Sequence, residues 1–91
     1  MAQVVITIRV MPDSPEVNLD DIQKQAAEKI AAFGSELGKA EKKPLAFGLQ
    51  SLDLIFVMDE DKGSPDSLEE DIKGLEGVKS AETVDVRRTI G

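Results

Sequence analysis

The sequence predicts an α+β fold in which a four-stranded antiparallel sheet carries two helices on one face. Apolar residues alternate in four stretches, as in strands, and recur at three- and four-residue steps in two others, as in helices. These stretches follow one another as strand, helix, strand, strand, helix, strand along 91 residues, a length that suits a single domain over 1–91. Right-handed crossovers then predict the strand order 4-1-3-2 of the ferredoxin-like sandwich.

The first strand is predicted over residues 4–10, where every second side chain is apolar. A loop with two prolines follows, and Asn18 predicts the N-cap of a helix that Gly34 ends. The apolar stripe expected to face the sheet consists of Leu19, Ile22, Ala26, Ile30 and Phe33.

Two further strands are predicted on either side of a chain reversal. Residues 37–44 read as a weak edge strand, because lysines at an edge discourage pairing with other sheets. Lys42 and Lys43 are interpreted as such edge charges. Residues 49–58 form the most apolar stretch, so we expect them in the interior of the sheet.

The second half of the chain predicts a charged turn, a helix and a last strand. In the turn at 59–63, Gly63 stands where a calcium loop needs a ligand, and Ser64 after it stands where the loop needs glycine, so we expect a solvated turn. Ser64 is the expected N-cap and Pro65 the expected first residue of a helix that ends near Gly74 and Gly77. Its apolar stripe is Leu68, Ile72 and Leu75.

The last strand is predicted over 78–88, before a frayed tail at 89–91. Strict alternation puts Val78, Val84 and Val86 on one side, and Ala81, Thr83, Asp85 and Arg87 on the other. On the face without helices, which we call the open face, Arg9 and Arg87 should meet Asp53 and Asp85. Such cross-strand ion pairs are expected to contribute less than ~1 kcal/mol each.

The chain reversal at residues 44–48, which we call the corner, is the candidate contact point for another protein. Pro44 restricts the backbone, and Gly48 allows conformations closed to other residues. Phe47, between them, is one of three aromatic residues in the chain. An aromatic residue beside a glycine at a stiff reversal is expected to project into solvent.

The composition excludes several functions. The chain has no cysteine and no histidine, which removes thiol chemistry, the usual general base and the commonest metal ligand. No catalytic pair, cofactor motif or metal motif is found, so we expect a binding protein and not an enzyme. A net charge of −7 argues against direct binding to nucleic acid. No membrane span or secretory signal is visible, and we expect a cytoplasmic protein that is monomeric when free.

The whole chain resembles the archaeal elongation factor 1-beta family. The resemblance is carried by residues 10–12 before an acidic loop, the Pro-Leu-Ala-Phe-Gly-Leu corner, the acidic turn at 59–63 and the ending Val-Asp-Val-Arg-Arg at 84–88. Members of that family have a ferredoxin-like fold. They are guanine-nucleotide exchange factors for elongation factor 1-alpha, the GTPase that delivers aminoacyl-tRNA to the ribosome.

The resemblance implies the partner-binding residues Phe47, Gly48, Pro44, Arg88 and Arg87. Phe47 would dock in a pocket of the GTPase domain, and a C-terminal cation would disturb the Mg²⁺ ligation. Arg88 stands where the eukaryotic relatives have a penultimate lysine, and three residues follow it here instead of one. Arg87 could act instead. The alternative function is a small-molecule-binding regulatory module, since a ferredoxin-like fold does not determine function.

Overall fold

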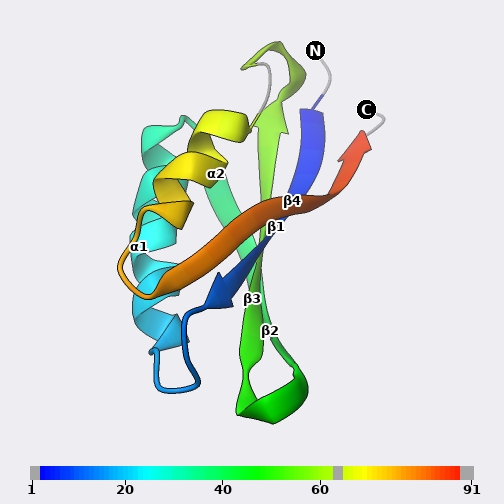
Figure 1. Cartoon of the computed structure of the whole chain (residues 1–91). Coiled ribbons are helices and arrows are strands. Elements are labelled where there is room, and N and C mark those ends of the chain that lie inside the picture. Colours follow the sequence, from blue (N-terminus) through cyan, green and yellow to red (C-terminus); the bar gives the residue numbers. More distant parts are fainter. Residues whose placement is uncertain (1–2, 63–64, 89–91) are drawn as a thin grey trace.

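The computed structural model of the chain describes residues 3–62 and 65–88. Within these residues, four antiparallel strands form one sheet in the order β2-β3-β1-β4, and two helices lie on one of its faces (Figure 1). This is the predicted order 4-1-3-2 read in reverse, so the predicted fold is confirmed. The elements are β1 (Gln3–Pro12), α1 (Leu19–Ala32), β2 (Glu36–Pro44), η1 (Ala46–Gly48), β3 (Gln50–Asp59), η2 (Glu60–Lys62), α2 (Asp66–Lys73) and β4 (Val78–Arg88).

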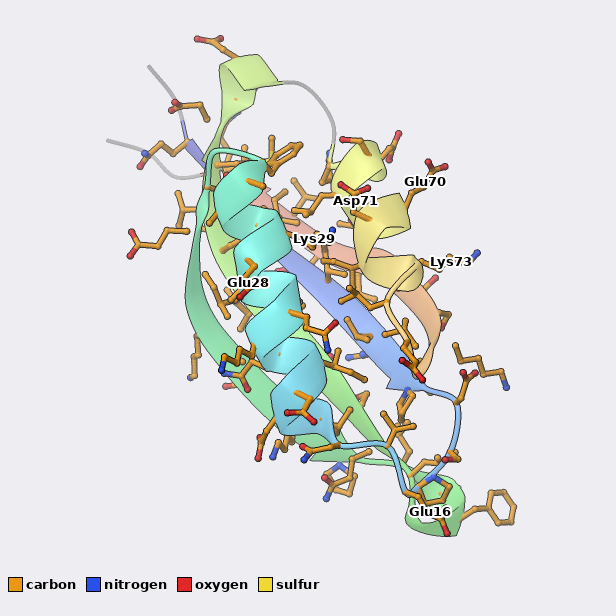
Figure 2. The ribbon with its side chains drawn as sticks, turned by 90° about the vertical axis from the view of Figure 1, so that its left-hand side faces the viewer. Glu16, Glu28, Lys29, Glu70, Asp71 and Lys73 are labelled. Atoms are coloured by element: carbon orange, nitrogen blue, oxygen red, sulfur yellow. The ribbon has the colours of Figure 1, made fainter. Side chains whose placement is uncertain are left out.

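The core lies between the helices and the sheet. The alternating residues of β1 and β3 are buried on this face, as predicted, and the stripes of both helices pack onto them. Phe33 and Leu75 are only partly buried at the edge of this core. The outer sides of the helices carry charged groups, which Figure 2 shows for Glu28, Lys29, Glu70, Asp71 and Lys73. The principal core residues are Ile6, Ile8, Val10, Ile22, Ala26, Ile30, Leu52, Leu54, Phe56, Met58, Leu68 and Ile72.

The first helix begins and ends as the sequence predicts, whereas the second begins differently. The Asn18 side chain accepts hydrogen bonds from the backbone N–H groups of Asp20 and Asp21 at 2.9 and 3.4 Å. Gly34 follows the helix with a φ of 97°. Pro65, expected as the first helical residue, instead occupies the N-cap of α2. Proline has no side-chain acceptor, so no side-chain cap bond forms there. Ser64, the expected cap, lies outside the described residues.

The predicted faces of the last strand are wrong in part, because β4 does not alternate regularly. Its pairing with β1 shifts register between Thr7 and Ile8, and again between Met11 and Pro12. Each shift changes which side chains of β4 face the helices. As a result, Val78 and Ala81 are both buried against the core, although strict alternation would separate them. Val86 stays largely exposed.

The remaining boundaries differ from prediction by one or two residues. β1 extends to Pro12, β2 starts at Glu36, and β3 runs one residue further than expected, to Asp59. The corner contains the short 3₁₀ turn η1, and residues 60–62 of the charged turn form a second one. The tail at 89–91 lies outside the described residues.

Candidate partner-binding surface

The corner presents the aromatic ring of Phe47 to solvent. The backbone N–H of Leu45 donates to the Leu49 carbonyl at 2.7 Å, and the N–H of Leu49 donates to the Ala46 carbonyl at 3.3 Å. These bonds close a tight loop between β2 and β3. Within it, Phe47 is 94% exposed. The expectation that this side chain projects is confirmed, and its packing into the protein's own core is excluded.

The backbone at the tip of the corner is left-handed at two consecutive residues. Phe47 has a φ of 62° and Gly48 a φ of 77°. Glycine adopts this region freely, whereas a phenylalanine there is uncommon and costs on the order of 1 kcal/mol. The exposed ring gains little burial in return. Neither the backbone conformation nor the burial of the ring therefore favours a phenylalanine at this position for the stability of the fold.

A hollow of about 230 Å³ lies beside the corner. Its walls come from the loop between β1 and α1, including Pro12, Pro15 and Val17, and from Lys42 and Gly48. Figure 1 shows that this loop and the corner occupy the same end of the molecule. The surface at this end of the molecule therefore combines the projecting ring of Phe47 with the hollow beside it.

The residues that lead into the corner are held by ion pairs on both faces of the sheet. On the helix side, the Lys42 ammonium lies 2.7 Å from the carboxylate of Asp20 at the start of α1. On the open face, the Lys43 ammonium lies 3.4 Å from the carboxylate of Asp53 in β3. Both lysines lie on an edge strand of the sheet, as predicted, and in addition each forms an ion pair. They connect the end of β2 to the helix layer and to the interior of the sheet.

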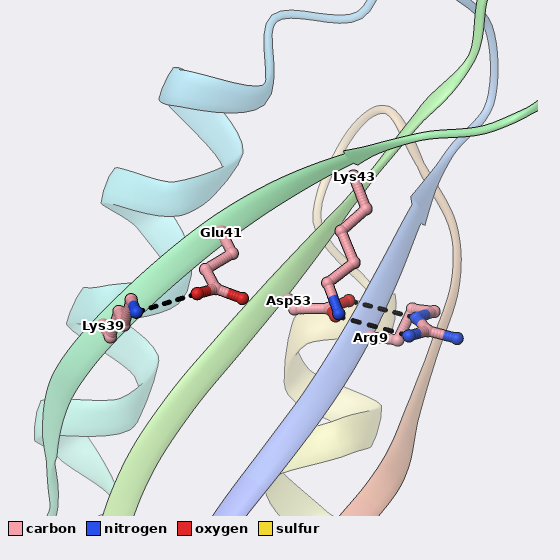
Figure 3. Close-up of polar contacts among 5 residues, drawn as sticks. All are labelled: Arg9, Lys39, Glu41, Lys43 and Asp53. Atoms are coloured by element: carbon pink, nitrogen blue, oxygen red, sulfur yellow. Dashed lines mark hydrogen bonds and ion pairs between the residues drawn. The ribbon is translucent and has the colours of Figure 1, made fainter.

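Asp53 is the centre of the polar contacts on the open face (Figure 3). The guanidinium of Arg9 donates to its two carboxylate oxygens, from Nε at 3.1 Å and from Nη2 at 3.3 Å. These bonds raise the pKa of Arg9 above its ordinary value. The predicted Arg9–Asp53 pair is confirmed, but the Asp53 side chain is only 3% exposed. The pair is therefore partly buried, with its carboxylate almost fully enclosed and its guanidinium in contact with solvent.

The C-terminal arginines are both engaged by acidic side chains. Arg87 Nε lies 2.9 Å from the carboxylate of Asp85 on the open face, as predicted. Arg88 pairs with Glu60 of η2. Both arginine side chains remain mostly exposed. A partner could therefore reach either guanidinium by replacing one surface carboxylate.

The structure brings the corner residues together but places the arginines at the other end of the sheet. In β3, Gln50 pairs with Pro44 at the corner end, while Met58 lies opposite Val4, which also pairs with Arg88. At ~3.3 Å per residue, these positions of β3 are about 26 Å apart. Figure 1 shows the corner and the C-terminal end of β4 at opposite ends of the long axis.

Sequence reasoning missed the part that Lys42, Lys43 and Glu60 take in these contacts. One signal was available for Asp53, because a carboxylate in the middle of the most apolar strand needs a cationic partner. The partner from β2 could not be inferred, since it depends on the register of an edge strand that carries a bulge after Leu37.

The described residues contain no group of three or more acidic residues placed to hold a metal ion. Over the same residues, neither helix is long and apolar enough to cross a membrane. Among the described residues, the exposed ring of Phe47 lies at one end of the sheet and the two mostly exposed arginines lie at the other.

Comparison with known families shows which class of protein this chain belongs to. Residues 5–89 match the family described as the EF-1 guanine nucleotide exchange domain. The chain belongs to this family, and the resemblance noted in the sequence is confirmed. The elongation factor 1-beta of Methanothermobacter thermautotrophicus is 43% identical over 97% of this chain and 98% of its own length. That of Sulfurisphaera tokodaii is 38% identical over 97% of each chain.

Solved structures show the same fold at lower identity. The ACT domain from GTP pyrophosphokinase of Chlorobium tepidum is 20% identical and has a TM-score of 0.59. The match covers 90% of this chain and 99% of that domain. At this identity the likeness extends to the arrangement of strands and helices alone.

Proposed function

We propose that this chain promotes the exchange of GDP for GTP on elongation factor 1-alpha and so regenerates the active form of that GTPase. Support comes from the exchange-domain family to which the chain belongs and from its relatives named elongation factor 1-beta. The observation that carries the proposal is the exposed, left-handed Phe47 at the tip of the corner. The chain acts in the cytoplasm as a monomer, with no cofactor and no bond-making chemistry of its own.

The thermodynamic requirement is a preference for one state of the GTPase. GDP is held largely through its phosphates and Mg²⁺. An exchange factor shifts this equilibrium only if it binds the nucleotide-free GTPase more tightly than the GDP-bound one. By linkage, the factor weakens GDP binding by the same ratio by which GDP weakens binding of the factor.

The corner supplies the docking contact in this proposal. Phe47 enters a pocket of the GTPase domain, while Pro44 and Gly48 shape the reversal that presents the ring. A rigid, exposed aromatic side chain loses little conformational freedom on docking, which favours it as a contact that carries much of the affinity.

One of the two C-terminal arginines approaches the Mg²⁺ region of the GTPase and disturbs the ligation of the metal. Arg88 would leave Glu60 to do this, and Arg87 would leave Asp85. Exposed pairs of this kind contribute up to about 1 kcal/mol, so the partner's anionic groups can replace them. Because these arginines lie about 26 Å along the sheet from the corner, the GTPase must present two separate contact areas.

The test is the release of fluorescently labelled GDP from the cognate elongation factor 1-alpha. We expect substoichiometric amounts of this chain to accelerate release in the presence of excess unlabelled nucleotide, because the factor is recovered after each exchange. No acceleration at micromolar concentrations would reject the proposal. Binding that is equally tight to the GDP-bound and nucleotide-free GTPase would reject it as well.

A further inference from the structure

The carboxylate of Asp53 is buried in the sheet close to the base of the corner. Its carboxylate accepts two hydrogen bonds from Arg9 of β1, and it lies 3.4 Å from the Lys43 ammonium of β2 (Figure 3). One side chain therefore connects three adjacent strands on the open face.

Lys43 is the residue that transmits this contact to the corner. It immediately precedes Pro44, and its backbone lies opposite Ser51, two residues from Asp53 along β3. The lysine side chain therefore extends diagonally back across the sheet to reach the carboxylate. Lys42 pairs with Asp20 on the other face, so the base of the corner is held from both sides.

We propose that Asp53 is a positioning residue for nucleotide exchange, which it serves by ordering the corner through Lys43. This inference rests on the proposed function. The Asp53 carboxylate is buried while its cationic partners are partly exposed, and a pair of this kind gains little stability over apolar packing, so the specific geometry that it imposes explains its presence. With the corner ordered before binding, Phe47 enters the partner without the entropic penalty of immobilising a mobile loop.

The competing explanation is that Asp53 stabilises the fold as a whole and has no specific effect on the corner. The two explanations are separated when the exchange kinetics are compared with the amount of folded protein. A loss of folded protein lowers the active concentration, and it is measured independently by thermal unfolding. A mobile corner raises the concentration of factor needed for half-maximal exchange and leaves the maximal rate unchanged, because the docked complex is the same.

The first measurement compares Asp53→Asn with the wild-type chain in the GDP-release assay, at a temperature where both are folded. We expect the half-saturating concentration to rise about fivefold and the maximal rate to be retained. Lys39→Gln is the matched control, because it removes the 2.8 Å Lys39–Glu41 pair from the same face of β2 without touching Asp53. The control should behave as wild type.

The second measurement is a double-mutant cycle with Lys43→Met. If Asp53 acts through Lys43, the lysine variant raises the half-saturating concentration in the wild-type background and adds little in the Asp53→Asn background. Fully additive effects would overturn the proposal, since they would mean that Lys43 contacts the partner directly.

The third measurement needs no partner. The amide of Leu45, which donates to Leu49 at the neck of the corner, should exchange with solvent about fivefold faster in Asp53→Asn. Core amides such as that of Leu54 should keep their hydrogen-exchange rates. The control variant Lys39→Gln should change neither the rate at Leu45 nor the rates at core amides.

The outcomes separate this inference from the proposed function. If wild-type protein accelerates GDP release and Asp53→Asn matches it at every concentration, the role of Asp53 is overturned and the proposed function stands. Equal acceleration of exchange at core amides and at Leu45 would also overturn it. If the wild-type protein has no effect on GDP release, the proposed function fails, and the role of Asp53 in exchange fails with it.

Discussion

At the scale of single residues, Phe47 combines an unfavourable backbone conformation with a side chain that contacts solvent. Asparagine tolerates a positive φ better than phenylalanine does, and the ring is 94% exposed. We therefore expect Phe47→Asn to raise the free energy of unfolding by about 1 kcal/mol while exchange activity is lost. Urea denaturation measures the first effect. A clear loss of stability would contradict this account, because it would show that the ring supports the fold.

Glu41 provides a pH-dependent prediction at the same scale. A hydrogen bond from Lys39 lowers the pKa of the Glu41 carboxyl below its usual value. A lowered pKa in the folded state stabilises the fold above the carboxyl's unfolded pKa, and this contribution disappears as the pH falls through the folded pKa. An NMR titration should show the low pKa in wild type and a return towards the usual value in Lys39→Gln. An unchanged pKa in that variant would contradict the assignment.

At the scale of elements, the glycines around α2 differ in what they allow. Gly77 has a φ of 88°, and a Cβ there would lie 3.0 Å from a Val17 methyl group in the loop between β1 and α1. Gly77→Ala should therefore destabilise the protein by about 1–2 kcal/mol. Gly74, the C-cap of α2, has helical backbone angles and room for a methyl group. Gly74→Ala should be neutral or stabilising by about 0.5 kcal/mol in thermal unfolding. Equal effects at the two positions would contradict this reading.

The elements also show where prediction from the sequence works and where it stops. Alternation and helical stripes were enough to place the cores of β1, β3 and α1, because one face of each is buried along its whole length. The faces of β4 could not be predicted, since two register shifts alter the alternation without an obvious residue signal. Pro65 was misplaced by one position, because proline occurs both at the cap and just inside a helix.

The candidate site was also predictable only in part: the projecting ring could be predicted, but the ion pairs of the site could not. A proline and a glycine around Phe47 predicted a projecting ring, which depends only on local backbone geometry. The ion pairs of Asp53 with Lys43 and of Arg88 with Glu60 connect residues far apart in the sequence. They depend on strand register and on the reach of long side chains, which the spacing of residues does not determine.

At the scale of the whole molecule, the two candidate contact regions lie at opposite ends of a particle 42 Å long. Residues this far apart, with no shared contacts, usually contribute independently. Alanine variants of Arg87 and Arg88 identify which arginine affects GDP release. Combining the active one with Phe47→Ala should give additive losses in activation free energy, within about 0.5 kcal/mol. A large departure from additivity would show that ring and cation act at one shared place.

The measurement that tests the central claim most directly is GDP release from elongation factor 1-alpha in the presence of Phe47→Ala. We predict a loss of at least about tenfold in exchange efficiency, or about 1.4 kcal/mol, with an unchanged free energy of unfolding. Val84→Ala, which truncates a half-exposed side chain on β4, is the control and should retain activity. Wild-type exchange rates in a folded Phe47→Ala protein would contradict the account.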